Sequence, residues 1–113
     1  MRVLIAEDEW LIATVIERTL LDAGIEVAGI AGSITSALQL LDSCEFDAAV
    51  LDANLGGASA APIAAALSKR GVPYLVISGY ADRQRSGLLA AAPFIGKPFA
   101  PHTLVAALQQ LKA

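Results

Sequence analysis

The sequence predicts an α/β fold in which a parallel sheet carries helices on both faces. Short apolar runs alternate with longer stretches of helical periodicity along the chain, and this alternation is typical of β–α–β units. The length of 113 residues fits one compact domain, residues 1–113. Because 56% of the residues are hydrophobic and only 17% are charged, the composition supports a packed core.

The first half of the chain is expected to contain three strands and two helices. The strands are the apolar runs at residues 2–6, 25–31 and 48–51. The first helix spans residues 9–23, because apolar side chains recur there at helical spacing, and Gly24 ends it. Ser33 or Ser36 caps the second helix, which runs to about Cys44.

The second half continues the same alternation. Two further strands are expected, at residues 72–78 and 94–96. An alanine-rich helix at residues 59–70 ends at Gly71, and Pro101 begins a last helix. Residues 79–93, between the two strands, are the least regular stretch, because a glycine and three charged residues weaken any helix there.

Charge, hydropathy and cysteine content weigh against several classes of function. The formal net charge is −3 and no basic stripe is visible, which argues against direct nucleic-acid binding. No apolar run approaches the roughly 18 residues of a membrane-spanning helix. The single cysteine, Cys44, permits no internal disulfide, so we expect a reducing, cytoplasmic setting.

Polar side chains stand where the expected strands end: Glu7, Asp8, Asp52, Ser78 and Lys97. In an open parallel sheet these ends share one edge, where ligands bind. If the first and third strands are neighbours, Asp8 and Asp52 face each other, and Mg²⁺ suits such oxygen ligands. Lys97 and Ser78 can hold the oxygens of a phosphoryl group, and Asp52 can act as the nucleophile. Taken singly, each residue also fits a helix cap, a turn or a solvated charge.

Four motifs carry a family resemblance that runs from end to end of the chain. They are residues 3–9 (VLIAEDE), 47–57 (DAAVLDANLGG), 76–79 (VISG) and 94–99 (FIGKPF). The set resembles the receiver domain of response regulators in two-component signalling. The resemblance implies a flavodoxin-like, five-stranded parallel sheet in the order 2-1-3-4-5. It also implies a phosphoacceptor that changes its binding to partners and turns over no external substrate.

The resemblance further implies a role for each site residue. Asp52 is the residue expected to be phosphorylated, and Ser78 and Lys97 are expected to contact phosphoryl oxygens. The implied Mg²⁺ ligands are Asp8, Asp52, the backbone carbonyl of Asn54 and, through a water molecule, Glu7.

Two features near the fifth strand also follow from the resemblance. The Lys97–Pro98 peptide bond is expected to be cis, as cis bonds are largely confined to proline. Phe94 stands three residues before Lys97, where the family carries a switch aromatic. In the switch that the resemblance implies, Ser78 moves toward the phosphate and the aromatic ring then turns inward. The alternative is that Phe94 is simply a core residue.

Residues 73–80 resemble a receiver subclass with a Ser-Gly-Tyr step after the fourth strand. That subclass is often associated with histidine kinases of the HWE type, so the implied partner is a sensor kinase or a phosphotransfer protein. The stretch from Ser78 to Lys97 looks short for the family, and we expect the fourth helix to be short, displaced or mobile. Tyr80 falls where family members tune dephosphorylation, and its ring is expected to shield the aspartyl phosphate from water.

Three other functions share parts of this pattern. A Mg²⁺-dependent phosphohydrolase would commonly carry a second Asp where this chain has Asn54, and it would want a cap domain. For a receiver-fold scaffold that is not phosphorylated, the retention of Asp8, Asp52, Ser78 and Lys97 is an argument against, and the scaffold stays the alternative. A flavodoxin-like cofactor binder would want a hydroxyl-rich phosphate loop where residues 7–9 are all acidic. Both a stand-alone regulator and a segment of a longer protein fit the sequence.

Overall fold

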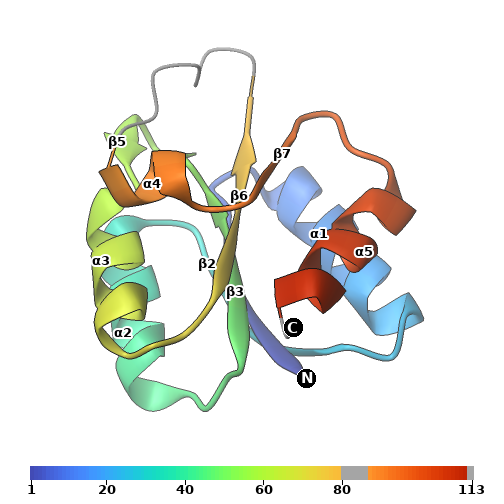
Figure 1. Cartoon of the computed structure of the whole chain (residues 1–113), viewed down its shortest axis with the longest axis horizontal. Coiled ribbons are helices and arrows are strands. Elements are labelled where there is room, and N and C mark those ends of the chain that lie inside the picture. Colours follow the sequence, from blue (N-terminus) through green and yellow to red (C-terminus); the bar gives the residue numbers. More distant parts are fainter. Residues whose placement is uncertain (80–86, 112–113) are drawn as a thin grey trace.

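The computed structural model describes residues 1–79 and 87–111 and is organised around a five-stranded sheet (Figure 1). The strands of this sheet are β1 (Arg2–Ala6), β2 (Glu26–Ala31), β3 (Ala48–Asp52), β6 (Tyr74–Ser78) and β7 (Phe94–Gly96). Neighbouring strands are parallel and follow the order β2-β1-β3-β6-β7. Because β6 and β7 are the fourth and fifth strands of the sheet, the predicted order is confirmed.

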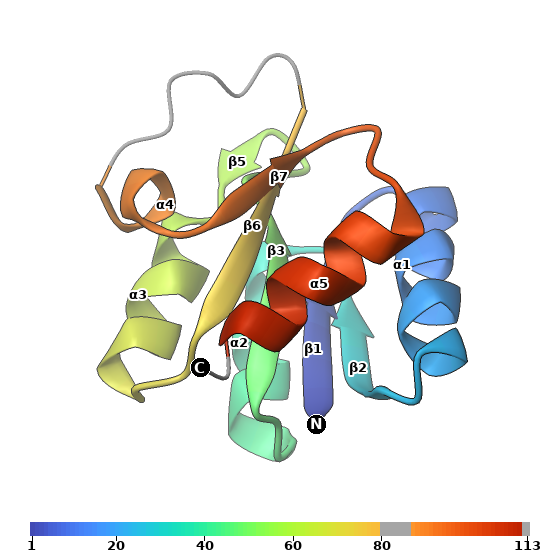
Figure 2. The ribbon, with the colours of Figure 1, turned by 45° about the vertical axis from the view of Figure 1, so that its right-hand side comes forward.

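Helices cover both faces of the sheet (Figures 1 and 2). On one face lie α1 (Trp10–Asp22) and α5 (Pro101–Leu111), and on the other lie α2 (Ile34–Ser43), α3 (Ala61–Lys69) and α4 (Gly87–Ala91). The five-residue α4 packs against α3, which agrees with the expectation of a short fourth helix for the residues described. Tyr80, for which we predict a shielding role, lies outside the described residues.

The sheet separates two hydrophobic cores, because successive side chains of a strand point to opposite faces. Leu4 and Ala6 of β1 join the core formed with α2 and α3. Val3 and Ile5 of the same strand join the core formed with α1 and α5. All four side chains are fully buried. Burial on both faces explains why the strands read as continuous apolar runs in the sequence.

Local sequence chemistry sets the element ends. Ser33 is the N-cap of α2, and its hydroxyl accepts from the Ser36 amide at 3.1 Å while the Ser36 hydroxyl accepts from the Ser33 amide. Both predicted caps therefore take part in one capping box. The third helix begins at Ala61 rather than at Ser59, because Ser59 belongs to a short hairpin.

That hairpin, β4 (Asn54–Leu55) and β5 (Ala58–Ser59), stands where the sequence led us to expect only a loop. The two strands are antiparallel and are joined by the two glycines between them. The hairpin lies directly after Asp52, so it forms part of the site described below.

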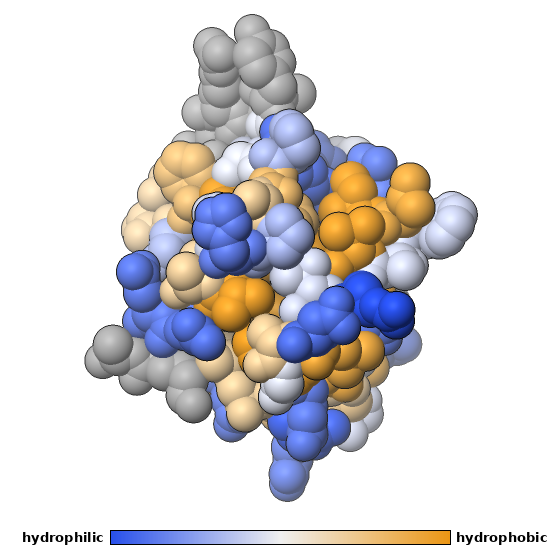
Figure 3. Space-filling model, turned by 90° about the vertical axis from the view of Figure 1, so that its right-hand side faces the viewer, coloured by the Kyte–Doolittle hydropathy of each residue, from blue (hydrophilic) through white to orange (hydrophobic). Residues whose placement is uncertain are grey.

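The surface formed by α1 and α5 mixes apolar and polar side chains (Figure 3). On α1, the exposed apolar residues are Trp10, Leu11, Val15 and Leu21. In the described part of the chain, every helix is too short or too polar to cross a lipid bilayer.

Candidate functional site

Three carboxylates meet at the carboxyl edge of the sheet. Glu7 and Asp8 directly follow β1, and Asp52 is the last residue of β3. These strands are neighbours, with Ala6 paired to Leu51, so their ends lie side by side. One oxygen of each carboxylate lies within 4.8 Å of the others. The topology therefore brings together the acidic residues that are far apart in the sequence.

Lys97 bridges two of these carboxylates. It follows β7, and its Nζ lies 2.8 Å from Glu7 Oε1 and 2.8 Å from Asp52 Oδ2. The contact with Asp52 is a hydrogen bond, whereas the contact with Glu7 is an ion pair without hydrogen-bond geometry. The Lys97 amide donates to the Ser78 carbonyl at 2.9 Å, and this bond holds Lys97 beside the end of β6. The Lys97–Pro98 bond is cis, as predicted.

Burial and charge shift the proton affinities of this cluster in a consistent way. Burial raises the pKa of Glu7 from 4.5 to about 7, against the opposing effect of Lys97. Burial also disfavours the charged form of Lys97, but hydrogen bonds and charge from Asp52 and Glu7 outweigh it and raise the pKa of Lys97. The two shifts are compatible because Asp52 supplies Lys97 with a second anionic partner. Lys97 therefore stays cationic, and Glu7 exchanges its proton near neutral pH.

Asp8 differs from Glu7 although the two are adjacent in the sequence. Glu7 is 2% exposed, while Asp8 is exposed at the start of the loop to α1. The Gly56 amide donates to Asp8 Oδ2 at 3.0 Å. Burial acts to raise the pKa of Asp8, but the Gly56 amide and other hydrogen bonds lower it below 3.8. Asp8 is thus an ionised ligand candidate at neutral pH.

Two of the remaining predicted residues lie beside Asp52. The Asn54 amide donates to Asp52 Oδ1 at 3.2 Å, and the predicted role of the Asn54 carbonyl as a metal ligand stays a prediction. Ser78 ends β6 next to β3, is 5% exposed, and donates from its hydroxyl to the Gly79 carbonyl at 3.3 Å.

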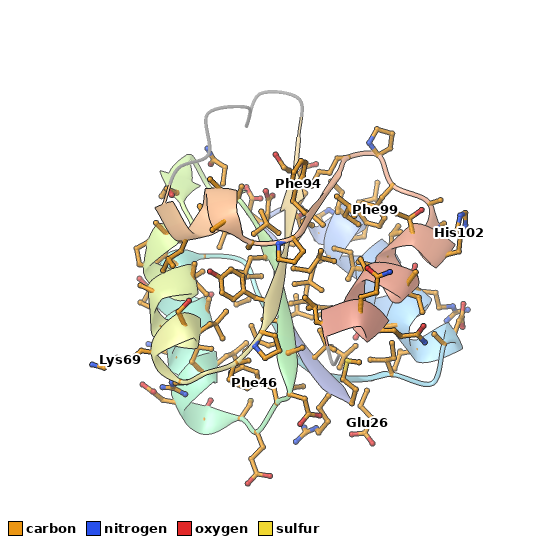
Figure 4. All side chains as sticks on the ribbon, in the orientation of Figure 1. Glu26, Phe46, Lys69, Phe94, Phe99 and His102 are labelled. Atoms are coloured by element: carbon orange, nitrogen blue, oxygen red, sulfur yellow. The ribbon has the colours of Figure 1, made fainter. Side chains whose placement is uncertain are left out.

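Phe94 opens β7 and is 52% exposed (Figure 4). The alternative that Phe94 is a core residue is therefore wrong. An exposed aromatic on the strand that leads to Lys97 remains compatible with the predicted switch position.

The residues of this edge fit a magnesium ion. Mg²⁺ prefers oxygen ligands and is held in proteins by one or two carboxylates together with water. Three carboxylates with oxygens within 4.8 Å supply that donor set. The nearby ammonium of Lys97 leaves the cluster with net negative charge, which favours a divalent cation.

Gly56 also belongs to this edge, and it is not among the site residues predicted from the sequence. The sequence predicts a loop at residues 55–57, although two glycines between potential strand residues are a recognised signal for a tight hairpin. The contact between Gly56 and Asp8 joins residues 48 positions apart, and no local pattern predicts such a contact.

The chain belongs to the response regulator receiver domain family of two-component systems, because the family model matches residues 3–109. It is similar to the transcriptional regulatory protein PdtaR of Mycobacterium tuberculosis, with 32% identity over 115 residues, covering 96% of this chain and 55% of that protein. The chain thus spans about half the length of the curated relatives that it matches.

Solved structures agree with this assignment. The solution structure of SdrG from Sphingomonas melonis Fr1 matches with a TM-score of 0.89 and 32% identity, over 100% of this chain and 97% of that chain. The response regulator PhyR from Brucella abortus matches with a TM-score of 0.82 and 29% identity, over 97% of this chain and 46% of that chain.

Proposed function

We propose that residues 1–113 form one receiver domain that accepts a phosphoryl group on Asp52 in a Mg²⁺-dependent reaction. One observation carries the proposal: a carboxylate at the end of β3 lies with two further carboxylates and a lysine ammonium at the open edge of the sheet. This set combines a nucleophile, a cation site and a fixed positive charge. Membership of the receiver family supports the same chemistry.

The reaction is a transfer between two side chains. An Asp52 oxygen attacks the phosphorus of a phosphohistidine on the donor protein, the P–N bond breaks, and a P–O bond forms. Bound Mg²⁺ would neutralise charge on the phosphoryl oxygens. The residues proposed to hold it are Asp8, Asp52, the Asn54 carbonyl and, through water, Glu7. No external substrate is turned over, because the phosphoryl group stays on the protein until it is hydrolysed.

Lys97 and Ser78 are proposed to receive the oxygens of the transferred group. In the unphosphorylated protein the Lys97 ammonium already lies 2.8 Å from Asp52 Oδ2, so a phosphoryl group on that carboxylate would come within its reach. An ammonium has three donors and can keep Glu7 as a second partner. The Ser78 hydroxyl at the end of the adjacent strand would donate to another oxygen, and Phe94 would respond as the switch aromatic.

The proposed phosphoryl donor is a sensor histidine kinase or a phosphotransfer protein, acting in the cytoplasm. The donor has to reach Asp52 from the open edge of the sheet. Beside that edge lies a groove of about 420 Å³, lined in part by Leu11, Val15 and Phe99. Trp10, at the start of α1, is also an apolar side chain of this helix that is 75% exposed. These features support docking of a donor protein there; assignment of the donor to the HWE type rests on residues 73–80.

The test is the intact mass of the protein after incubation with acetyl phosphate and Mg²⁺. We expect one added phosphoryl group in the wild type and in Asp22→Asn, a matched change at the exposed end of α1. We expect none in Asp52→Asn and none in EDTA. Retention of the adduct in Asp52→Asn would show that another residue is the acceptor. If the wild type gains no phosphoryl group from acetyl phosphate or from a histidine kinase, the scaffold interpretation replaces the proposal.

A further inference from the structure

The hairpin after Asp52 is defined by its two glycines. Leu55 pairs with Ala58, and the turn between them consists of Gly56 and Gly57 alone. Both have positive φ, +58° and +86°, which is the requirement of a type I′ turn. A two-residue turn is closed by bonds between its flanking residues. The amides of the two glycines therefore lie outside the ladder of the hairpin and are available to other groups.

The hairpin is fixed relative to the phosphoacceptor strand. The Leu55 side chain is 2% exposed and packs in the core under α3. The Ala60 amide donates to the Ala53 carbonyl at 2.9 Å and closes the base of the hairpin. The Asn54 amide donates to Asp52 Oδ1 at 3.2 Å. In Figure 2 the hairpin strand β5 lies at the upper end of the sheet, where β6 ends.

From this fixed base the turn reaches the other metal carboxylate. The Gly56 amide donates to Asp8 Oδ2 at 3.0 Å across 48 residues of sequence. Asp8 is exposed on the loop after β1, so its side chain would otherwise retain rotamer freedom that ligand binding must remove. A carboxylate has about four lone-pair sites, so the oxygen that accepts from Gly56 and its partner oxygen can still bind a cation.

We infer that Gly56 is a positioning residue of the metal site: its amide holds Asp8 in place for Mg²⁺, and the hairpin thereby sets the separation of Asp8 from Asp52. The inference rests on the proposed magnesium site. Hydrogen bonds to metal ligands from groups outside the coordination sphere orient the ligands and commonly change metal affinity by 10–100-fold. Here a single hairpin contacts both carboxylates, at Asn54 and at Gly56.

The first test is amide hydrogen exchange by NMR in the metal-free wild-type protein. We expect the Gly56 amide to be protected and the Gly57 amide to exchange faster, although the two are adjacent and exposed. The protection of Gly56 should disappear in Asp8→Ala, which removes the acceptor. Equal exchange of the two amides, or protection that survives Asp8→Ala, would overturn the inference.

The second test is the affinity for Mg²⁺ alone, measured by calorimetry. Gly56→Ala and Gly57→Ala are matched, because each places a Cβ in open space at a positive φ. We expect Gly56→Ala to weaken binding about 10-fold and Gly57→Ala to have a clearly smaller effect. Gly56→Asn should bind Mg²⁺ with near wild-type affinity. Asn tolerates the left-handed conformation better than Ala does, so the backbone amide at this position stays directed at Asp8.

The outcomes separate this inference from the proposed function. If the wild type binds Mg²⁺ but the two Ala variants lose the same affinity, or Gly56→Asn restores nothing, the positioning role is wrong and the magnesium site stands. If the wild type binds no Mg²⁺, both are overturned.

Discussion

Glu7 provides a pH-dependent test of the buried charge cluster. Its carboxyl is fully buried and lies 2.8 Å from the Lys97 ammonium, and burial raises its pKa from 4.5 to about 7. Because the folded state binds this proton more tightly than the unfolded chain, Glu7 stabilises the fold below pH 4.5. That stability is lost as the pH rises through about 7.

Glu7→Gln removes this dependence, because Gln mimics the protonated form at every pH. Each pH unit by which a pKa is raised corresponds to about 1.4 kcal/mol, so the raised pKa of Glu7 lowers the free energy of unfolding by roughly 3 kcal/mol once the carboxyl is fully ionised. We therefore expect the variant to match the wild type near about pH 4, to exceed its free energy of unfolding by roughly 2 kcal/mol at about pH 6, and by roughly 3 kcal/mol at about pH 8.

The assay is urea denaturation of both proteins across this pH range in EDTA, which keeps metal out of the comparison. Glu45→Gln, a change at an exposed glutamate, serves as the control. A stability difference between Glu7→Gln and the wild type that does not vary with pH would refute the reasoning. So would a variant that is less stable at high pH, since the neutral form would then not be the preferred state of the buried group.

Two further predictions concern packing and charge. Lys97→Met leaves two buried carboxylates without their shared cation, and we expect it to lower the free energy of unfolding by about 3–5 kcal/mol at about pH 8; unchanged stability in urea denaturation would mean that these carboxylates are not ionised together. Gly29→Ala would place a Cβ 3.1 Å from a methyl carbon of Leu40, whereas at Gly32 the nearest atom is 3.9 Å away. We expect the first to cost about 1 kcal/mol and Gly32→Ala to stay within about 0.5 kcal/mol by thermal or urea unfolding; equal effects would contradict this difference in space.

The fold was largely predictable because both faces of the sheet are covered. Strands such as β3 are buried at every position, so they appear as unbroken apolar runs whose ends are marked by the first charged residue. The position of Asp52 follows from this rule, as does that of Glu7. The pairing of β1 with β3 follows from the strand order of the family rather than from local sequence.

Other features depend on tertiary contacts that local patterns do not encode. The strands of the β4–β5 hairpin have two residues each, which is too short for periodicity to reveal. Glu7 is buried and Asp8 is exposed, and this difference depends on which side of the end of β1 is covered by other elements. Phe94 is exposed because β7 is a short edge strand with alternating burial, and the sequence of an edge strand does not state what lies over it.

The division of the interior by the sheet has a consequence for how this sequence can diverge. Leu4 and Ile5 are adjacent in the chain but belong to different cores, whereas Leu4 and Leu51 share one. Residues without common packing partners contribute additively to stability, whereas residues in contact do not. Epistasis should therefore follow the two layers rather than sequence proximity. Each core can accumulate substitutions independently of the other, while the residues at the carboxyl edge, where both cores meet the site, are constrained by both.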